Sequence, residues 1–235
     1  NTLSDQLTML GLEVDDLSPA AKPFTGVVVG EVLTVEQHPD ADRLRVTTVN
    51  IGSGEPLQIV CGAPNVRVGM KVPVATIGAV LPGDFKIKKG KLRGIESQGM
   101  LCGASEIDLE DKIDGLLELP VDAPVGVDIR EYLQLDDHVI DISITPNRGD
   151  CFSIRGIARE IGVINQLTVT APEINAVAAT IADEKKVVVS TEGCPRYLGR
   201  VIKNVNTKAA TPEWMERALV RSGIRQHSIL VDITN

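Results

Sequence analysis

Hydrophobic and polar positions divide the chain into helical and strand-like stretches. Residues 4–10 have the spacing of a short helix, with Ser4 as its cap, Leu7 and Leu10 on one face, and Gly11 as its stop. From about residue 26 onward, short runs rich in Val and Ile are separated by Gly, Pro, Asn and Asp, a pattern that predicts strands. These predicted strands are 27–36, 44–51, 57–61, 71–77, 85–88, 99–102 and 116–119, after a short one at 12–14.

Helical spacing returns beyond residue 150. Apolar residues spaced three and four apart predict an amphipathic helix over 151–164, capped by Asp150. A second helix is predicted over 212–222, with Thr211 as cap, Pro212 as first residue, and Trp214 as a packing residue. Segment 165–186 is predicted to be irregular, and the runs 187–190, 197–202 and 229–233 have a strand-like composition.

The spacing of the predicted strands indicates a small barrel or sandwich. Many short strands with frequent turns are typical of such folds, and barrel closure removes the exposed edges of a Val-rich sheet. Segment 18–25 contains Pro19 and Pro23 and is predicted to be a linker. With 43% hydrophobic but only 3% aromatic residues, the core is expected to be built from aliphatic side chains.

Charge and cysteine usage narrow the function classes. A net charge of −8 argues against indiscriminate binding of polyanions, so any nucleic-acid site must be a local basic patch. The cysteines lack any C-x-x-C pair, which argues against a zinc site and favours reduced thiols in a cytosolic protein. No apolar run approaches the length of a membrane span. The chain starts without Met and stops just after the apolar run 229–233, so we expect a piece of a longer protein.

One stretch is markedly basic. It holds five cations within eight residues that include no acid, namely Lys86, Lys88, Lys89, Lys91 and Arg93. Such side chains neutralise RNA phosphates and release counterions, while Gly90 and Gly94 would let the backbone turn sharply beside a ligand. The alternative is a solvated strand and turn that balances an acidic domain.

A second pair of cations alternates with apolar residues. Arg43 and Arg45 could point outward and extend the basic stretch, or could simply be solvated. Phe24 and Phe85 are the only aromatic residues near these segments, and recognition of splayed bases usually uses aromatic platforms. We therefore predict recognition of shape and backbone, without a base code.

Candidate reactive groups are sparse. Cys61 could act as a nucleophile with His38, His138 or His227 as base, but no spacing orders such a pair, which favours a buried structural thiol. His38 precedes Pro39 and is predicted to belong to a turn. Asp40 and Asp42 lack the remaining ligands of a calcium loop and are predicted to be turn residues.

Three stretches of the strand-rich region, in this order, resemble the EMAP-type OB domain, a tRNA-binding module of aminoacyl-tRNA synthetases. They are 38–46 (HPDADRLRV), 59–65 (IVCGAPN) and 87–106, which begins IKKGKLRG. The flanks 9–15 (MLGLEVD), 144–151 (ITPNRGDC), 194–201 (CPRYLGRV) and 231–235 (VDITN) resemble the beta subunits of bacterial-type phenylalanyl-tRNA synthetases. This second resemblance covers essentially the whole chain.

The resemblance implies an α+β multidomain chain. An OB-fold β-barrel at 22–132 is inserted into a small helical domain, formed by 1–21 and 133–172, whose two helices pack together. The start of an α/β B3/B4-type editing domain follows at 173–235. The seven cations Arg43, Arg45, Lys86, Lys88, Lys89, Lys91 and Arg93 become the candidate tRNA contacts.

The resemblance also implies that the sites for the reaction's substrates lie outside this chain. In the family, ATP, magnesium and phenylalanine bind to the alpha subunit or to later parts of the beta subunit. This chain is therefore expected to hold no catalytic, cofactor or metal residues, and to work in a cytoplasmic α2β2 enzyme away from membranes. Two alternatives stay open: a stand-alone OB-type tRNA-binding or protein-interaction module, which would not need residues 138–235, and an enzyme with its active site inside this chain.

Overall fold

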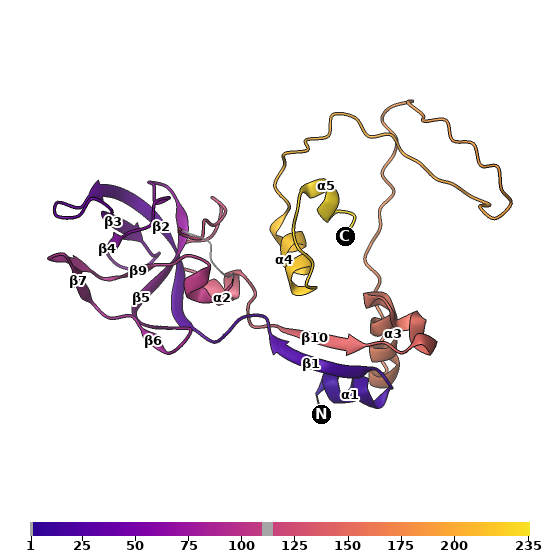
Figure 1. Ribbon diagram of the computed structural model, residues 1–235, viewed down its shortest axis with the longest axis horizontal. Helices are drawn as coiled ribbons and strands as arrows, with labels where there is room; N and C mark the ends of the chain where they lie inside the picture. Colours follow the sequence, from indigo (N-terminus) through magenta and orange to yellow (C-terminus); the bar gives the residue numbers. More distant parts are fainter. Residues whose placement is uncertain (1, 110–114) are drawn as a thin grey trace. The chain divides into compact units, whose positions relative to one another are not determined.

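A computed structural model of the protein describes residues 2–109 and 115–235 (Figure 1). The chain forms two compact units, one comprising Asp16–Ile140 and the other Asn1–Asp15 together with Asp141–Asn235. The boundary falls within a two-stranded sheet in which β1 (Glu13–Pro19) pairs with β10 (His138–Ser143). The predicted domain limits at 22 and 132 lie inside the first of these units, and they stay a prediction.

The unit 16–140 is a nearly closed antiparallel barrel, as the strand pattern predicted. Its main sheet has the order β4-β3-β2-β5-β6, with β9 also paired to β5, and β7 and β8 form a separate hairpin. The strands are β2 (Thr25–Gln37), β3 (Arg45–Asn50), β4 (Leu57–Cys61), β5 (Lys71–Leu81), β6 (Phe85–Lys86), β7 (Gly90–Leu92), β8 (Ile95–Ser97) and β9 (Gly99–Leu101).

Hydrogen bonds close the gap between β4 and the segment that joins β8 to β9. The Gln98 backbone amide donates to the Gln58 backbone carbonyl at 2.8 Å, and the Val60 backbone amide donates to Oγ of Ser97 at 3.1 Å. The hydroxyl of Ser97 in turn donates to the Gly99 carbonyl at 2.9 Å. A buried polar group needs such partners, so Ser97 satisfies the edge of β4 where regular pairing is missing.

Strand β2 contributes buried residues to two core clusters. Val27 and Val29 of β2 pack in one core cluster with Phe24 and Ile129, while Val32 packs in a second cluster. The second cluster comprises Val32, Val49, Ile59, Cys61, Met70, Val72, Val74, Leu101 and Leu116. Ile129 comes from the short helix α2 (Ile129–Tyr132), which contacts β2 (Figure 1). Aliphatic residues thus build the core, as composition predicted.

Two expectations for this unit are wrong. Segment 18–25 is not a free linker, because Ala21 and Phe24 are buried in the barrel core. Residues 116–119 do not form a strand, since only Leu119 makes an isolated bridge, to Lys71. Local composition could not reveal the burial of segment 18–25 or the absence of a strand at 116–119, because each depends on what the segment packs against or pairs with.

In the other unit, α1 (Leu3–Met9) packs against α3 (Ile154–Asn165), as the family resemblance implied. Gln6 and Asn165 exchange two side-chain hydrogen bonds of 3.0 and 3.1 Å. The caps differ from those predicted: Thr2 caps α1 and Ser153 caps α3. The 3-10 helix η2 (Pro146–Cys151) precedes α3 and contacts it.

Replacing Gly156 with alanine should destabilise α3, although Gly-to-Ala changes inside helices usually stabilise. A Cβ built on Gly156 would lie 2.1 Å from the Asp150 carbonyl oxygen and 2.8 Å from Cα of Cys151. Such overpacking typically costs about 1–3 kcal/mol. Amide hydrogen exchange of α3 should become faster in Gly156→Ala and stay unchanged in Gly149→Ala, where a Cβ meets open space. Slower exchange in Gly156→Ala would contradict the close approach of η2 and α3.

The C-terminal part contains two helices and no strand. Residues 166–212 have neither helix nor strand, so the strands predicted at 187–190 and 197–202 are absent, and 229–233 forms the helix α5 (Ile229–Asp232) instead. Strand-forming residues become a strand only when another strand offers hydrogen-bond partners, and no described residue pairs with these runs.

The helix predicted at 212–222 is present as α4 (Glu213–Arg221). Thr211 does not cap it; its hydroxyl donates to the Asp232 carboxylate at 2.5 Å. This hydrogen bond, with one from the His227 amide, holds the pKa of Asp232 below its usual value. Trp214 is 63% exposed and Leu219 is the buried residue of α4, so the packing role predicted for Trp214 is wrong.

Candidate nucleic-acid interface

The basic stretch forms an exposed edge of the barrel. Lys86 ends β6, and Ile87 beside it is buried, with its amide donating to the Ala79 carbonyl at 2.9 Å. Because successive side chains of an extended segment point to opposite sides, Lys86 and Lys88 lie on the solvent side. Lys91 is exposed in β7.

Arg93 stands at the tip of the β7–β8 hairpin. Arg93 and Gly94 form its two-residue turn with φ values of +50° and +87°. A turn with two positive φ angles matches the twist of the flanking strands and favours glycine at its second position. Gly94 therefore has the conformational role that was expected, whereas Gly90 has no positive φ and simply begins β7.

Two of the seven candidate cations are already engaged by neighbours. Lys89 forms an ion pair with Glu96 at 2.8 Å. Arg45 is half-buried, and its guanidinium donates to the carbonyls of Asp42 at 2.9 Å and Leu44 at 3.0 Å. Arg43 lies exposed in the loop before β3. Lys86, Lys88, Lys91, Arg43 and Arg93 are therefore the cations best placed to meet an anionic ligand.

His38 links the loop before β3 to the basic hairpin. It is 2% exposed, and its Nε2 lies 3.1 Å from the Leu92 carbonyl oxygen of β7. Its Nδ1 accepts a hydrogen bond from the Asp40 amide at 3.1 Å. The prediction of a turn residue is confirmed, because the His38 amide donates to the Leu44 carbonyl across this loop. The structure thus brings the first and third of the family-like stretches together.

A groove of about 520 Å³ runs beside the basic edge. One side is lined by Phe85, Lys86, Lys88 and Leu92. Cys61 at the end of β4 and the following Gly62 and Ala63 contribute to the lining, as do Gly103 and Glu106. Glu106 belongs to the 3-10 helix η1 (Ser105–Ile107), and its Oε2 accepts from the Gly103 amide at 2.7 Å. The second and third family-like stretches therefore face a common groove.

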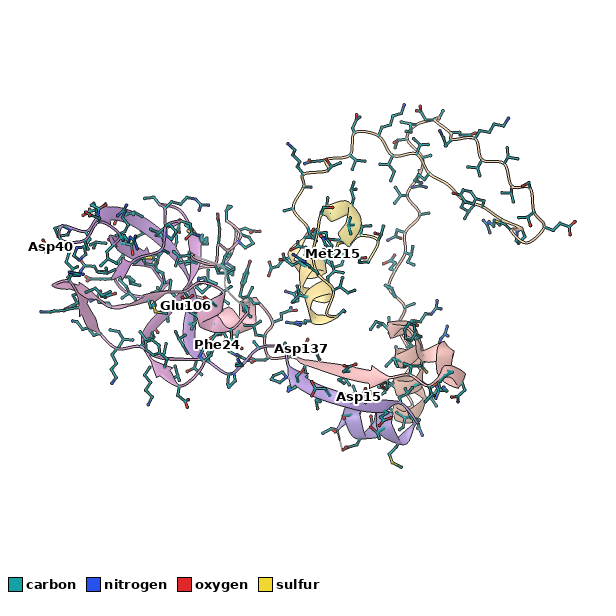
Figure 2. All side chains as sticks on the ribbon, viewed as in Figure 1. Asp15, Phe24, Asp40, Glu106, Asp137 and Met215 are labelled. Carbon is teal, nitrogen blue, oxygen red and sulfur yellow. The ribbon has the colours of Figure 1, made fainter. Side chains whose placement is uncertain are left out.

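Only one of the two aromatic candidates can contact a ligand. Phe24 is buried at the end of the barrel beside α2, with the Arg130 guanidinium 4.8 Å from its ring centre (Figure 2). Phe85 is 58% exposed and lines the groove next to Lys86. The sequence shows that Phe85 is near the basic stretch, and only the fold shows that it lines the groove.

The thiols of the barrel have the character of structural residues. Burial raises the pKa of Cys102 to about 12 and also raises the pKa of Cys61. A thiol protonated at neutral pH is a poor nucleophile, so Cys61 is disfavoured as a catalytic group. His38 is also a poor candidate for the base, because its two ring nitrogens face the Leu92 carbonyl and the Asp40 amide.

The acidic candidates do not assemble a cation site. Asp40 and Asp42 are exposed loop residues, and Asp40 uses its amide on His38 (Figure 2). Among the described residues, one group has metal-like spacing: Asp150, Cys151 and Glu160. Arg148 already occupies it, with its guanidinium 3.2 Å from Asp150 and 3.1 Å from Glu160, and these carboxylates raise the pKa of Arg148.

Two family models match the chain. The tRNA_bind model, described as "Putative tRNA binding domain", matches residues 27–128, and the B3/4 domain model matches residues 193–235. Three similar relatives are named phenylalanine–tRNA ligase beta subunit. Identity is 82% for that of Acinetobacter baylyi, 65% for that of Psychrobacter arcticus and 60% for that of Photorhabdus laumondii. The matches cover 100%, 99% and 100% of this chain.

Along its whole length, the chain is similar to phenylalanine–tRNA ligase beta subunits. It spans 30% of the length of each of these relatives. The resemblance to these beta subunits, drawn from seven short stretches of sequence, is therefore confirmed, and so is the α+β class with an OB-like barrel and the start of a B3/4 domain. Across the described residues, no helix is both long and apolar enough to cross a membrane.

Proposed function

We propose that this chain is the tRNA-binding and scaffolding N-terminal part of a phenylalanine–tRNA ligase beta subunit. The whole enzyme would attach phenylalanine to its tRNA with ATP and magnesium, in the cytoplasm, as an α2β2 assembly with an alpha subunit. The observation that carries this proposal is the 82% identity along the entire chain to a beta subunit of that name.

The barrel is the part that would contact tRNA. The match to the tRNA-binding domain model, residues 27–128, lies within the barrel unit. The exposed cations Lys86 and Lys88 line the groove, and Lys91 and Arg93 lie in the adjoining β7–β8 hairpin, in a chain that is acidic as a whole. Local cations on an acidic background favour a defined docking position over general polyanion binding. The two-stranded sheet and the α1–α3 pair would serve as scaffold.

The two alternatives are less well supported. A stand-alone tRNA-binding module would need only the barrel, yet identity to beta subunits extends through the flanking residues on both sides. An enzyme with its active site in this chain would need an activated nucleophile or base. Cys61 and Cys102 have raised pKa values instead, and Arg148 fills the metal-like cluster.

We expect the isolated chain to bind a tRNA transcript for phenylalanine and yet to lack phenylalanine-dependent pyrophosphate exchange. The physical reason is that the described residues supply cations for phosphate contacts but no assembled catalytic group. Fluorescence anisotropy and exchange assays on the same preparation test both halves. Exchange at the rate of the whole enzyme would refute the non-catalytic assignment, and failure to bind tRNA at about 50 mM salt would refute the binding role.

A further inference from the structure

The hydrogen bonds of His38 determine its tautomer. Nδ1 accepts the Asp40 amide proton, so the proton of a neutral ring resides on Nε2, which donates to the Leu92 carbonyl. Both ring nitrogens are thereby used in a side chain that is 2% exposed. The ring spans two segments that are 54 residues apart in sequence.

The hairpin has few other ties to the barrel. Within the described part of the chain, β7 pairs with β8 alone, in a sheet separate from the main one. Among the described residues, the bond from His38 to Leu92 is the one hydrogen bond that connects β7 to a segment other than β8. β8 is held independently, through the bond from the Gln58 side-chain amide to the Glu96 carbonyl at 2.8 Å and through Ser97.

We propose that His38 is a positioning residue of the tRNA-binding surface: it holds the β7 strand against the loop 38–44, so that Lys91 and Arg93 keep a fixed position relative to the loop that carries Arg43. This inference rests on the proposed function. Lys91, Arg93 and Arg43 would bind one tRNA together only while His38 fixes the hairpin relative to the loop. Their phosphate contacts add to one affinity only when the three charges keep fixed positions relative to one another.

Two substitutions separate this role from a merely structural one. In His38→Gln, the side-chain amide can still reach Leu92 as a donor, and the bond from Asp40 is lost. In His38→Asn, the shorter side chain can accept from Asp40 and cannot reach Leu92. Each variant loses one hydrogen bond, so a simple loss of stability would affect both to a similar degree.

Anisotropy titrations with the tRNA transcript for phenylalanine, at several salt concentrations, provide the test on the whole 235-residue chain. His38→Gln should stay within about 3-fold of the unchanged chain, while His38→Asn should bind about 10-fold more weakly with a salt slope reduced by about 1–2. If the two variants bound the transcript with equal affinity, the positioning role of His38 would be refuted, while the proposed function would stand. A lack of tRNA binding by the unchanged chain would overturn the proposed function as well.

A measurement without RNA or substitution provides a second, independent test. Nitrogen-15 spectra of the imidazole rings should show His38 with its proton on Nε2 and with that proton protected from exchange with water. Only three histidines are present, which makes assignment direct. A proton on Nδ1, or a rapidly exchanging Nε2 proton, would overturn the proposal even if both variants failed to fold.

Discussion

Replacing Lys86, Lys88 and Lys91 together with alanine is expected to weaken tRNA binding on the order of 100-fold near 0.1 M salt. Each phosphate contact contributes about 0.7–0.9 to the slope of log affinity against log salt, so three contacts lower the slope by about 2–3. The three side chains are exposed, and none takes part in an ion pair among the described residues. Anisotropy titrations across a range of salt concentrations measure both quantities.

The fold should survive this triple change, because exposed charges contribute at most about 1 kcal/mol each to stability. A matched control removes the same charge elsewhere, at the exposed residues Lys185, Lys186 and Lys208 outside the barrel. The control should leave the salt slope unchanged. Equal losses in both triple variants would mean that tRNA responds to net charge only, and the basic edge would then have no special role.

Lys89 offers an internal contrast within the same stretch. Its ammonium group already pairs with Glu96, so part of its charge is neutralised before any RNA arrives. The structure therefore ranks residues that the sequence presented as equivalent. Arg45 is a weaker candidate for a phosphate contact for a similar reason, since its guanidinium donates to the carbonyls of Asp42 and Leu44 in its own loop.

Replacing Ile59 with alanine is expected to lower the free energy of unfolding of the barrel by about 2–5 kcal/mol. Ile59 is fully buried in the cluster formed with Val32, Val72 and Leu101, and truncation there removes apolar contacts and leaves a cavity. Because domains are typically stable by only about 5–15 kcal/mol, this is a large fraction of the total. Urea unfolding followed by far-ultraviolet circular dichroism measures it, since the single tryptophan, Trp214, lies outside the barrel.

Ile77→Ala is the matched control for this change. Ile77 lies in β5 of the same barrel and is 51% exposed, so its truncation removes the same atoms from a largely solvated site. The control should cost less than about 1 kcal/mol. Similar losses in the two variants would contradict the assignment of Ile59 to a closely packed core.

Local patterns predicted the barrel well because its strands are regular and strongly apolar. The runs at 27–36, 44–51 and 57–61 correspond to β2, β3 and β4, and the aliphatic composition matches the core. The patterns were wrong where a segment has apolar residues but no partner strand, as at 187–190. They also failed at segment 18–25, where two prolines suggested a linker while Phe24 inserts into the core.

For the candidate site, the sequence by itself determined which residues could carry charge and that five cations lie within eight positions. Where the segment is extended, Lys86 and Lys88 share a side, because side chains two residues apart in a strand point the same way. Whether a cation is paired, and which distant loop stands beside it, depends on contacts across the chain. Only the tertiary structure could therefore decide that Lys89 pairs with Glu96 and that His38 reaches Leu92, since a side chain's partners are chosen by where the strands bring them.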